Sequence, residues 1–313
     1  MLRRLLLPLV CTVVLTVAAM LLPAAGHART PDSWTSKAAS RFWTPERMAD
    51  SMPASTSRLA PVAEPGAALG GAPGTGAAVH FGGVPTVGTL FSVGGDLTAH
   101  FCSASVVHSP GRDLILTAAH CEPGTDVSFV PGYRAGAAHQ PYGIWAVAEV
   151  FTDPRWTPDD DAASDYDFAF ARVRPGPHGR RLEDVTGANR LARTPGYHNR
   201  VTVIGYPHAV DNPADQAVTC TTTTARLQGL RQLQILCDGF FTGTSGSPWI
   251  LNYNTRTRSG TVIGLIGGLD GGGLTDRISY SPFFDEAVMT LYHTAVRAQA
   301  STLRPVVTGP KAG

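Results

Sequence analysis

The sequence has few charged residues and almost no excess of either sign. Lysine, arginine, aspartate and glutamate make up 16% of the 313 residues, and the formal net charge is +1. Such a surface has no strong field that would steer the protein to nucleic acid or to an anionic membrane. Apolar residues make up 43% of the chain, which is enough for a large core and argues against wholesale disorder. We therefore expect a globular protein that does not bind nucleic acid.

Long apolar runs are absent beyond the start of the chain. There, Leu5 to Leu22 is almost wholly apolar, follows Arg3 and Arg4, and precedes the small-x-small triplet Gly26-His27-Ala28. This order is typical of a signal peptide, which we predict over residues 1–28, with a secreted, extracellular product. The alternative is an uncleaved anchor, since the run approaches the length of a membrane span. The cleavage triplet argues against it, so we expect no membrane association after cleavage.

Cysteine is scarce, and one of the five, Cys11, lies in the predicted signal peptide. The four that remain are Cys102, Cys121, Cys220 and Cys237. An even number in an exported chain predicts two disulfides, for which three pairings are possible. Pairing of sequence neighbours would close two loops of roughly 20 residues, each worth about 3 kcal/mol. The alternative is a zinc site, which the absence of a C-x-x-C pair disfavours, so we expect no metal.

The stretch from residue 29 to residue 80 lacks a periodic apolar pattern. Its part from Ala63 to Ala78 consists mainly of glycine, alanine and proline. This composition predicts a propeptide or a linker over residues 29–80. The large aromatic residues of the stretch, which suggest docking on a folded domain, are Trp34, Phe42 and Trp43. At the other end of the chain we expect residues 301–313 to be a flexible tail.

The body of the chain, residues 81–300, lacks long helical periodicity until its last part. Short runs rich in valine, isoleucine, phenylalanine and threonine, such as PTVGTLFSV, DLILTAA and RVTVIGYP, alternate with glycine, proline and aspartate. Many short strands with frequent turns predict an all-β sandwich or barrel. A C-terminal helix is predicted from Ser281, as N-cap, with Pro282 at its first position. Its apolar face is formed by Phe284, Val288, Leu291 and Ala295.

Two of three local signatures in the β body carry ionisable groups. In LILTAAHC a strand runs into a small-residue turn that ends in His120 and Cys121. In DYDFAFARV, Asp167 heads an alternating apolar run and could orient an imidazole by accepting its N–H, with Asp165 as a competitor. Taken alone, each is more often structural: a surface histidine, or an aspartate that begins a strand.

The third signature, GTSGSP, places Ser245 between glycines. Glycine permits the backbone conformation that presents a serine hydroxyl and lets amides converge on one point. The amides of Gly243 and Ser245 could then form an oxyanion hole, in which one donor is worth about 2.7–4 kcal/mol. The bland alternative is a Gly/Ser-rich turn. An esterase of the α/β-hydrolase class is a further alternative, which the β context and Pro248 disfavour.

Together the three signatures resemble the trypsin/chymotrypsin family of serine endopeptidases. TAAHC, DFAF and GTSGSP follow the family's order of histidine, aspartate and serine, and the resemblance covers roughly Val84 to Ala298. The ending GSP is more similar to the secreted bacterial glutamyl-endopeptidase-like (V8-like) branch. The resemblance implies two six-stranded antiparallel β-barrels with a C-terminal α-helix, and an active site in the cleft between them.

The resemblance also implies the roles of a catalytic triad. Ser245 would be the nucleophile, His120 the general base and Asp167 the group that orients the imidazole, with an acyl-enzyme as intermediate and no cofactor. The substrate would be a polypeptide, and we expect a monomer. A substrate strand would pair with the segment that contains Ile266, Gly267 and Gly268. The wall of the primary pocket would include Gly239, Phe240, Phe241 and Thr242.

The sequence departs from the family pattern at two places. Thr244 stands where the animal digestive enzymes carry an aspartate that pairs with a new N-terminus, so activation by that ion pair is not expected. Glutamyl-specific relatives have a histidine in the strand after the serine, and GLIGG contains none. Asp238, which could attract a basic side chain, is one position too far upstream. The alternative to an enzyme is a catalytically silent homologue that binds peptides or a protein partner.

Overall fold

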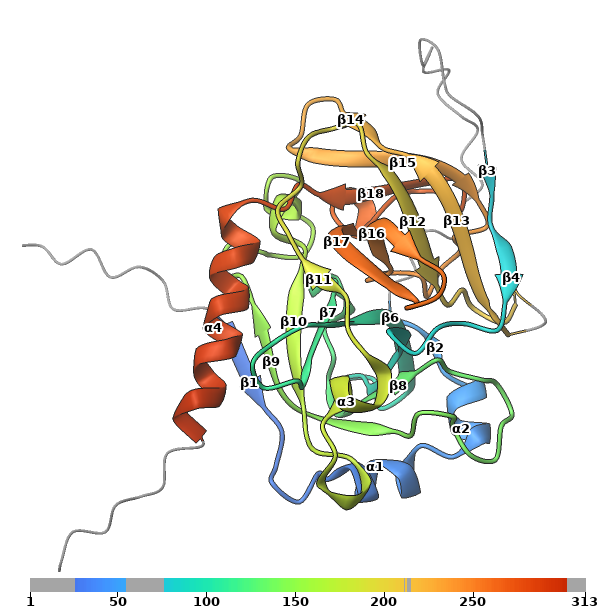
Figure 1. The fold of residues 1–313 in the computed structure, drawn as a ribbon, viewed down its shortest axis with the longest axis vertical. Helices are drawn as coiled ribbons and strands as arrows, with labels where there is room; N and C mark the ends of the chain where they lie inside the picture. The colour runs from blue at the N-terminus through green and yellow to red at the C-terminus, as the bar shows by residue number, and fades with distance from the viewer. Residues whose placement is uncertain (1–25, 55–75, 211, 213–214, 303–313) are drawn as a thin grey trace, which may run out of the picture.

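The computed structural model describes residues 26–54, 76–210, 212 and 215–302. Most of the predicted signal peptide and of the predicted tail lies outside these ranges. Two β units follow one another along the chain, and helix α4 (Glu286–Thr302) returns to pack against the first of them (Figure 1). Within the described ranges, no helix is both long and apolar enough to cross a membrane.

The first unit is a closed barrel. Its strands are β5 (Val87–Val93), β6 (Ala99–Val107), β7 (Leu114–Thr117), β8 (Thr125–Pro131), β9 (Trp145–Thr152) and β10 (Ala169–Val173). They pair antiparallel in the order β9-β10-β7-β6-β5-β8, and β8 pairs with β9 to close the sheet. Closure leaves no open edge, and buried side chains such as Val106, Ile115 and Phe129 fill the interior.

The second unit is built from two sheets around one core. The larger contains β4 (Val79–Phe81), β11 (Arg190–Leu191), β12 (Arg200–Gly205), β13 (Ala217–Thr223), β16 (Pro248–Asn254) and β17 (Ser259–Leu265). The smaller contains β3 (Gly76–Ala77), β14 (Ala225–Leu227), β15 (Gln232–Asp238) and β18 (Ile278–Pro282). The Cys220–Cys237 disulfide joins β13 to β15. The predicted two-barrel fold is therefore confirmed. The first barrel is closed by backbone pairing, and the second is formed by two sheets that pack against each other around one core.

The described part of the predicted propeptide or linker has regular structure. Its first part contains the end of β1 (Gly26–Arg29), followed by α1 (Ser36–Phe42), α2 (Pro45–Ala49) and β2 (Met52–Pro53), and its last part contains β3 and most of β4. β1 pairs with β9 and β2 with β6, so the first part lies along the first barrel, whereas β3 and β4 pair with β15 and β13 of the second unit. Trp34 and Trp43 are buried and donate their indole N–H groups to Val127 O and Asp126 O. The two buried tryptophans and the two short helices produce no periodic apolar pattern in the sequence. This explains why the composition of the segment predicted a propeptide or linker.

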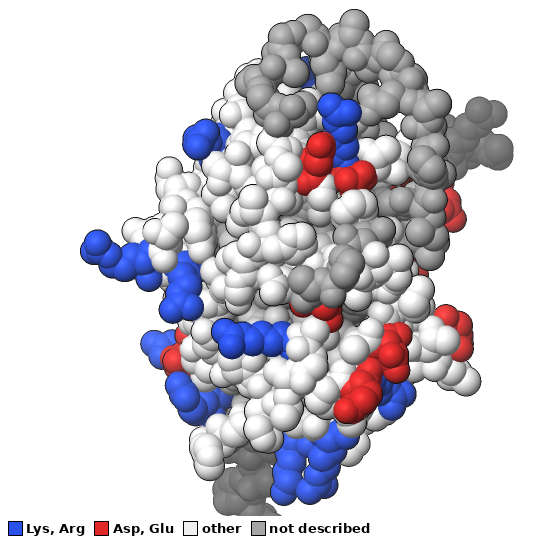
Figure 2. Space-filling view, turned by 90° about the vertical axis from the view of Figure 1, so that its right-hand side faces the viewer, with Lys and Arg blue, Asp and Glu red and all other residues white. Residues whose placement is uncertain are grey.

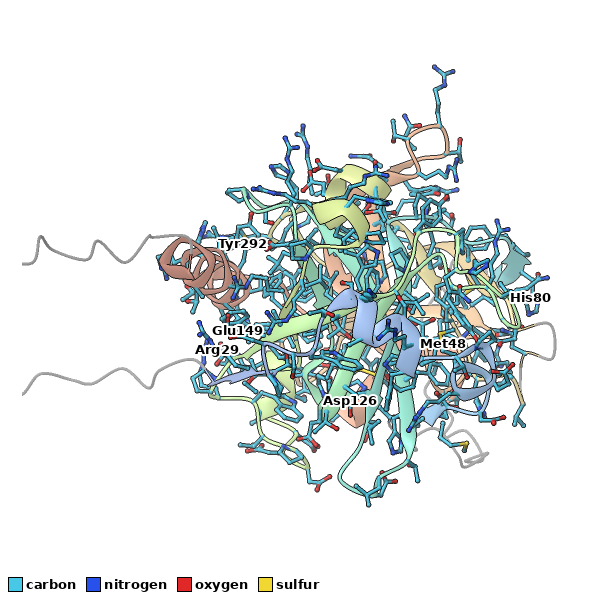
Figure 3. All side chains as sticks on the ribbon, turned by 90° about the horizontal axis from the view of Figure 1, so that it is seen from below. Arg29, Met48, His80, Asp126, Glu149 and Tyr292 are labelled. Atoms are coloured by element: carbon cyan, nitrogen blue, oxygen red, sulfur yellow. A yellow bond between two sulfur atoms is a disulfide. The ribbon has the colours of Figure 1, made fainter. Side chains whose placement is uncertain are left out.

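An ion pair fixes the start of this segment. Arg29 lies beside Glu149 on β9 (Figure 3), with 2.8 Å between Nε and Oε1. Arg172 on β10 contacts the other carboxylate oxygen at 2.6 Å, and Glu149 is buried. Burial alone would raise the pKa of Glu149, but the hydrogen bonds from the two arginines hold it below its ordinary value.

The C-terminal helix begins later than the sequence indicated. Ser281 and Pro282 belong to strand β18, where Ser281 Oγ accepts a hydrogen bond from Leu265 N, so the predicted start was wrong. Asp285 instead caps the helix through its carboxylate, which accepts from Ala287 N at 2.7 Å. The predicted apolar face is confirmed, since four side chains are almost fully buried: Phe284, Val288, Leu291 and Ala295.

Short helical turns connect the strands. They are η1 (Ala119–Cys121), η2 (Ala163–Tyr166), η3 (Pro177–Gly179), α3 (Leu182–Thr186) and η4 (Leu269–Gly271). Three of them, η1, η2 and η4, meet between the two units and carry or adjoin the residues of the candidate site. On the face shown in Figure 2, basic and acidic side chains both occur and most of the surface is uncharged, in keeping with the low net charge.

Candidate active site

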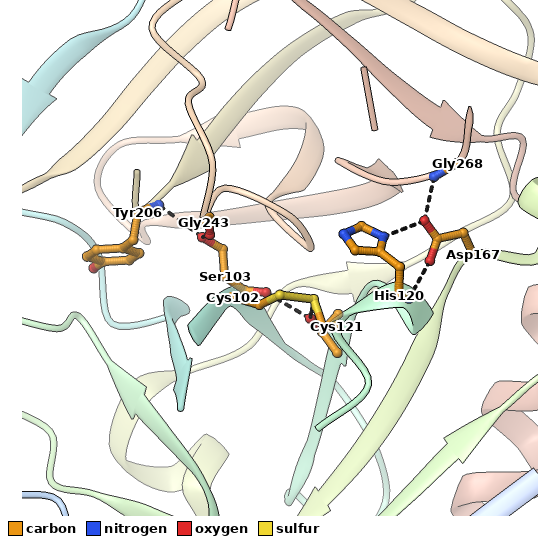
Figure 4. Close-up of a disulfide and its surroundings, with 9 residues drawn as sticks. Cys102, Ser103, His120, Cys121, Asp167, Tyr206, Gly243 and Gly268 are labelled. Atoms are coloured by element: carbon orange, nitrogen blue, oxygen red, sulfur yellow. Dashed lines mark hydrogen bonds and ion pairs between the residues drawn. A yellow bond between two sulfur atoms is a disulfide. The ribbon is translucent and has the colours of Figure 1, made fainter. Parts of the chain in front are cut away.

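The side chains of His120 and Asp167 meet where the two units face each other. His120 lies in η1, directly after β7, and Asp167 lies between η2 and β10. His120 Nδ1 is 2.7 Å from Asp167 Oδ2, and the backbone N–H of His120 donates to Oδ1 at 2.8 Å (Figure 4). Since a carboxylate only accepts, Nδ1 carries the proton in this contact and Nε2 is left to act as an acceptor.

A third donor reaches Asp167 from the second unit. Gly268 N donates to Oδ2 at 2.7 Å, and the aspartate is only 1% exposed (Figure 4). Asp165, the competitor in the sequence, instead accepts from the side chain of Gln232. Three hydrogen bonds thus fix the orientation of the Asp167 carboxylate against the imidazole.

The serine loop lies against β6 of the first barrel. Ser103 N donates to Ser245 O at 2.8 Å, and Ser103 Oγ donates to Gly243 O at 3.1 Å. Two glycines of the loop have positive φ, +91° at Gly243 and +83° at Gly246. A Cβ at Gly246 would lie 2.1 Å from Ser103 O, so glycine is required there by backbone angle and by space.

The amides of the loop divide into two sets. Thr244 N and Ser247 N donate within the loop, to Phe241 O and Thr244 O, and Gly246 N donates to Ile266 O. Among the described residues, the amides of Gly243 and Ser245 donate to no acceptor. Two free amides beside the serine are what an oxyanion hole requires.

Ser245 and His120 are not hydrogen-bonded to each other in this structure. His120 Nε2 is buried and has no partner among the described residues. Catalytic contacts are often long in a free enzyme and shorten when substrate binds. The geometry therefore supplies an oriented imidazole with a free acceptor nitrogen, next to a loop that presents a serine.

A cavity of about 570 Å³ is lined by His120 and Asp167, with Gly268 and Ala54 in its wall, and Ser245 is not among its lining residues. The other carboxylates that line it belong to Glu122, Asp159, Asp160, Asp161 and Asp270. Burial, and then the nearby Asp161, raise the pKa of Asp270. Three of these carboxylates belong to one acidic run of the sequence, residues 159–161. Its position at the cavity depends on chain folding that local sequence does not encode.

The residues predicted to bind substrate fall into different environments. Gly268 lines the cavity, and Gly267 lies against Asp167, whose Oδ2 would be 2.9 Å from a Cβ at that glycine. Phe240 and Ile266 are buried in the core of the second unit, so their side chains do not face a pocket. The remaining three, which lie outside the cavity wall, are Gly239, Phe241 and Thr242.

The segment expected to pair with a substrate strand is held inside the protein. Ile266 accepts from Gly246 N at 2.7 Å and donates to Ser247 O at 2.9 Å, which ties it to the serine loop. Gly267 N donates to Tyr280 O at 3.0 Å, and Gly268 N donates to Asp167. The amides of this segment are therefore used internally.

Both disulfides join sequence neighbours. Cys102 on β6 is bonded to Cys121 in η1, immediately after His120 (Figure 4), and Cys220 is bonded to Cys237. The first bridge fixes the turn that carries the imidazole to the strand that contacts the serine loop.

Comparison with known proteins gives the family. The family model described as Trypsin matches residues 75–283. The fold is similar to that of the protease Anisep from Arthrobacter nicotinovorans, with a TM-score of 0.59 and 25% identity over 70% of this chain and 98% of that one. No curated protein sequence matches the chain.

Two further solved structures share the fold at lower identity. A thermostable serine protease, AL20, from an extremophilic microorganism has a TM-score of 0.58 and 23% identity, over 68% of this chain and 97% of that one. A Glu endopeptidase has a TM-score of 0.53 and 17% identity, over 72% of this chain and 98% of that one. Because the family model spans most of the chain and its two-barrel fold is present, the chain belongs to the trypsin family of chymotrypsin-like serine proteases.

Proposed function

We propose that the protein is a secreted serine endopeptidase in which Ser245, His120 and Asp167 form the catalytic triad. The observation that carries the proposal is the hydrogen bond between His120 Nδ1 and Asp167 Oδ2, which leaves Nε2 buried and without a partner among the described residues. The serine loop lies close to the turn that carries His120, since a Cβ at Gly246 would be 3.2 Å from Ala118 N. The arrangement suits proton transfer from a serine hydroxyl.

In the first half of the reaction, Ser245 Oγ attacks the carbonyl carbon of the scissile peptide bond while His120 Nε2 takes the hydroxyl proton. The carbonyl oxygen becomes an oxyanion, which the amides of Gly243 and Ser245 stabilise. When the C–N bond breaks, His120 returns the proton to the leaving amine and the acyl group stays on Ser245 as an ester. Asp167 holds the imidazole tautomer and stabilises the imidazolium.

In the second half, water attacks the ester carbonyl and His120 takes its proton. Collapse of the second oxyanion breaks the bond to Ser245 Oγ, which recovers the proton, and the carboxylic acid product leaves. Each step uses side chains and amides of this chain, so the proposal requires no metal or organic cofactor.

The cavity beside His120 bears on the choice of substrate. Its wall carries several carboxylates, and burial, followed by the charge of the nearby Asp161, raises the pKa of Asp270. Opposite charge is attracted to such a cleft and like charge is repelled. Peptides with basic side chains near the scissile bond are therefore the favoured substrates in this proposal, and acidic ones are disfavoured.

Export agrees with the two disulfides, which form in oxidising compartments. In the proposal, residues 1–28 are removed on export, and residues 29–80 contain a propeptide or linker. Its residues 29–54 lie along the first barrel, and its residues 76–80 contain β3 and most of β4 of the second unit. The mature enzyme acts on polypeptides as a monomer.

The test is a peptide-library digest with the secreted protein, with Ser245→Ala as control. The proposal predicts cleavage by the native chain, enrichment of arginine and lysine near the cut, and no cleavage by the control. A silent homologue would bind library peptides without cutting them, and that result would overturn the proposal. Cleavage without basic enrichment would remove only the substrate preference.

A further inference from the structure

Gln232 is a buried amide that the mechanism leaves unused. It begins strand β15 of the second unit and is fully buried, at 0% exposure. A long polar side chain is buried at a cost unless its polar atoms are hydrogen-bonded. The partners of Gln232 therefore show what the residue does.

Both ends of the Gln232 amide are hydrogen-bonded, to different parts of the chain. Its Nε2 donates to Ser164 Oγ at 2.7 Å and to Asp165 Oδ1 at 3.0 Å, both in η2. Its Oε1 accepts from Leu269 N at 3.0 Å, at the start of η4. One side chain thus bridges two turns that lie more than thirty residues from it in sequence.

Both turns contact Asp167, η2 through the backbone of the aspartate and the residue before η4 through its carboxylate. Asp167 N donates to Ser164 O at 3.2 Å, so η2 sets the backbone of the aspartate. Gly268 N, one residue before Leu269, donates to Asp167 Oδ2. A Cβ at Gly268 would lie 2.4 Å from Gln232 Oε1, which shows how closely the amide packs against that turn.

We propose that Gln232 is a positioning residue for the Asp167–His120 pair, by locking η2 and η4 around the carboxylate. The inference rests on the proposed function of this site. An amide suits the position because it donates to η2 and accepts from η4 at once. A methionine of similar length would fill the space but leave both turns without their partner. A glutamate would keep the acceptor, lose the donor and face Asp165 with a second negative charge.

The test compares Gln232→Met and Gln232→Glu with Gln234→Met. Gln234 lies on the same strand and is partly exposed. Among the described residues its side chain donates only to Arg226 O, so its variant controls for changes to β15. We expect Gln232→Met to lower kcat about 10- to 100-fold with little change in KM, as loss of an outer partner of a reactive group does elsewhere. The control should keep the native kcat.

Two further readouts separate positioning from a general structural role. We expect the proton between His120 Nδ1 and Asp167 Oδ2 to give a far-downfield NMR signal in the native protein, because the two atoms are only 2.7 Å apart. This signal should shift or broaden in Gln232→Met but not in the control. The Gln232→Glu variant regains a donor when its carboxyl is protonated, so its activity relative to the native protein should rise as the pH falls.

The result that would overturn the inference is a Gln232→Met protein with native kcat and an unchanged downfield signal. If that variant does not fold, a Gln232→Glu protein whose relative activity is independent of pH overturns it instead. A native protein that is not labelled by a fluorophosphonate would mean that the proposed function itself fails. A labelled native protein with unaffected Gln232 variants would mean that only the role of Gln232 fails.

Discussion

Gly246 packs so closely against Ser103 that a Cβ on the glycine would lie 2.1 Å from the serine's carbonyl oxygen. Gly246 follows Ser245, and Ser103 N donates a hydrogen bond to Ser245 O at 2.8 Å. This close approach of β6 to the serine loop joins the two units at Ser245, the proposed nucleophile. The position of Ser245 therefore depends on the absence of one side chain.

Replacing that glycine should displace the loop. We expect Gly246→Ala to lose most activity. It should also lower the free energy of unfolding by more than the penalty for a side chain at positive φ, because the new Cβ would clash with Ser103 O. Gly229→Ala is the matched control, because Gly229 has the same φ of +83° and open space around it. The control should cost about 1–2 kcal/mol, the usual penalty for a side chain at positive φ. Equal losses of stability in urea melts, with activity kept in both, would contradict this packing.

Asp167→Asn should leave the fold intact and remove most catalysis. An asparagine amide cannot hold the imidazole in the tautomer that leaves Nε2 as acceptor, so we expect kcat to fall by roughly ten-thousandfold. The matched control is Asp184→Asn, because the carboxylate of Asp184 pairs with Arg112 on the surface, away from the candidate site. Steady-state kinetics and thermal melts on both variants make the comparison. Native kcat in Asp167→Asn would show that the aspartate does not act in catalysis.

The two disulfides should differ in their effect on activity. Replacing either pair by alanine should cost about 3 kcal/mol of stability, since both loops have similar lengths, with separations of 19 and 17 residues. Only loss of Cys102–Cys121 should also lower kcat at temperatures where the protein stays folded, because that bridge adjoins His120. Intact-mass analysis after thiol blocking should find no free thiol in the mature native protein, and free thiols would contradict both bridges.

Asp113 should make stability depend on pH in an unusual direction. Burial raises the pKa of Asp113 to about 6, although Arg172 and Arg181 act against the shift. Between about pH 4 and pH 6 the native state then binds a proton that the unfolded chain has released, so stability contributed by this group falls as the pH rises. Asp113→Asn cannot ionise and should gain stability over the native protein above pH 6 but not at pH 4. Urea unfolding at both pH values measures the difference, and a constant difference would contradict the shift.

The triad could be proposed from the sequence because each of its three residues stands in a short local motif. TAAHC places His120 at the end of a strand, and GTSGSP supplies the glycines that the serine turn needs. Gln232 could not be predicted, because its partners lie in turns distant along the chain and a lone glutamine in a strand carries no local signal. The same holds for the acidic cavity wall, which assembles residues from three loops.

Other features were missed because two structures compete for one local pattern. Ser281 and Pro282 match a helix start, but Ser281 Oγ is taken by Leu265 N, and the strand continues to Pro282. Phe240 was expected in the wall of the primary pocket, but its ring is buried in the core of the second unit. In each case tertiary contacts decide between alternatives that the local sequence leaves open.

Labelling with a fluorophosphonate tests the central claim, that His120 and Asp167 activate Ser245, most directly. The reagent reacts with a serine that an adjacent base has activated, and peptide mapping by mass spectrometry locates the adduct. The account predicts one adduct per folded mature chain, on Ser245, strongly reduced in Asp167→Asn and absent in Ser245→Ala. A folded, fully processed protein with no adduct, or with its adduct on another residue, would contradict it.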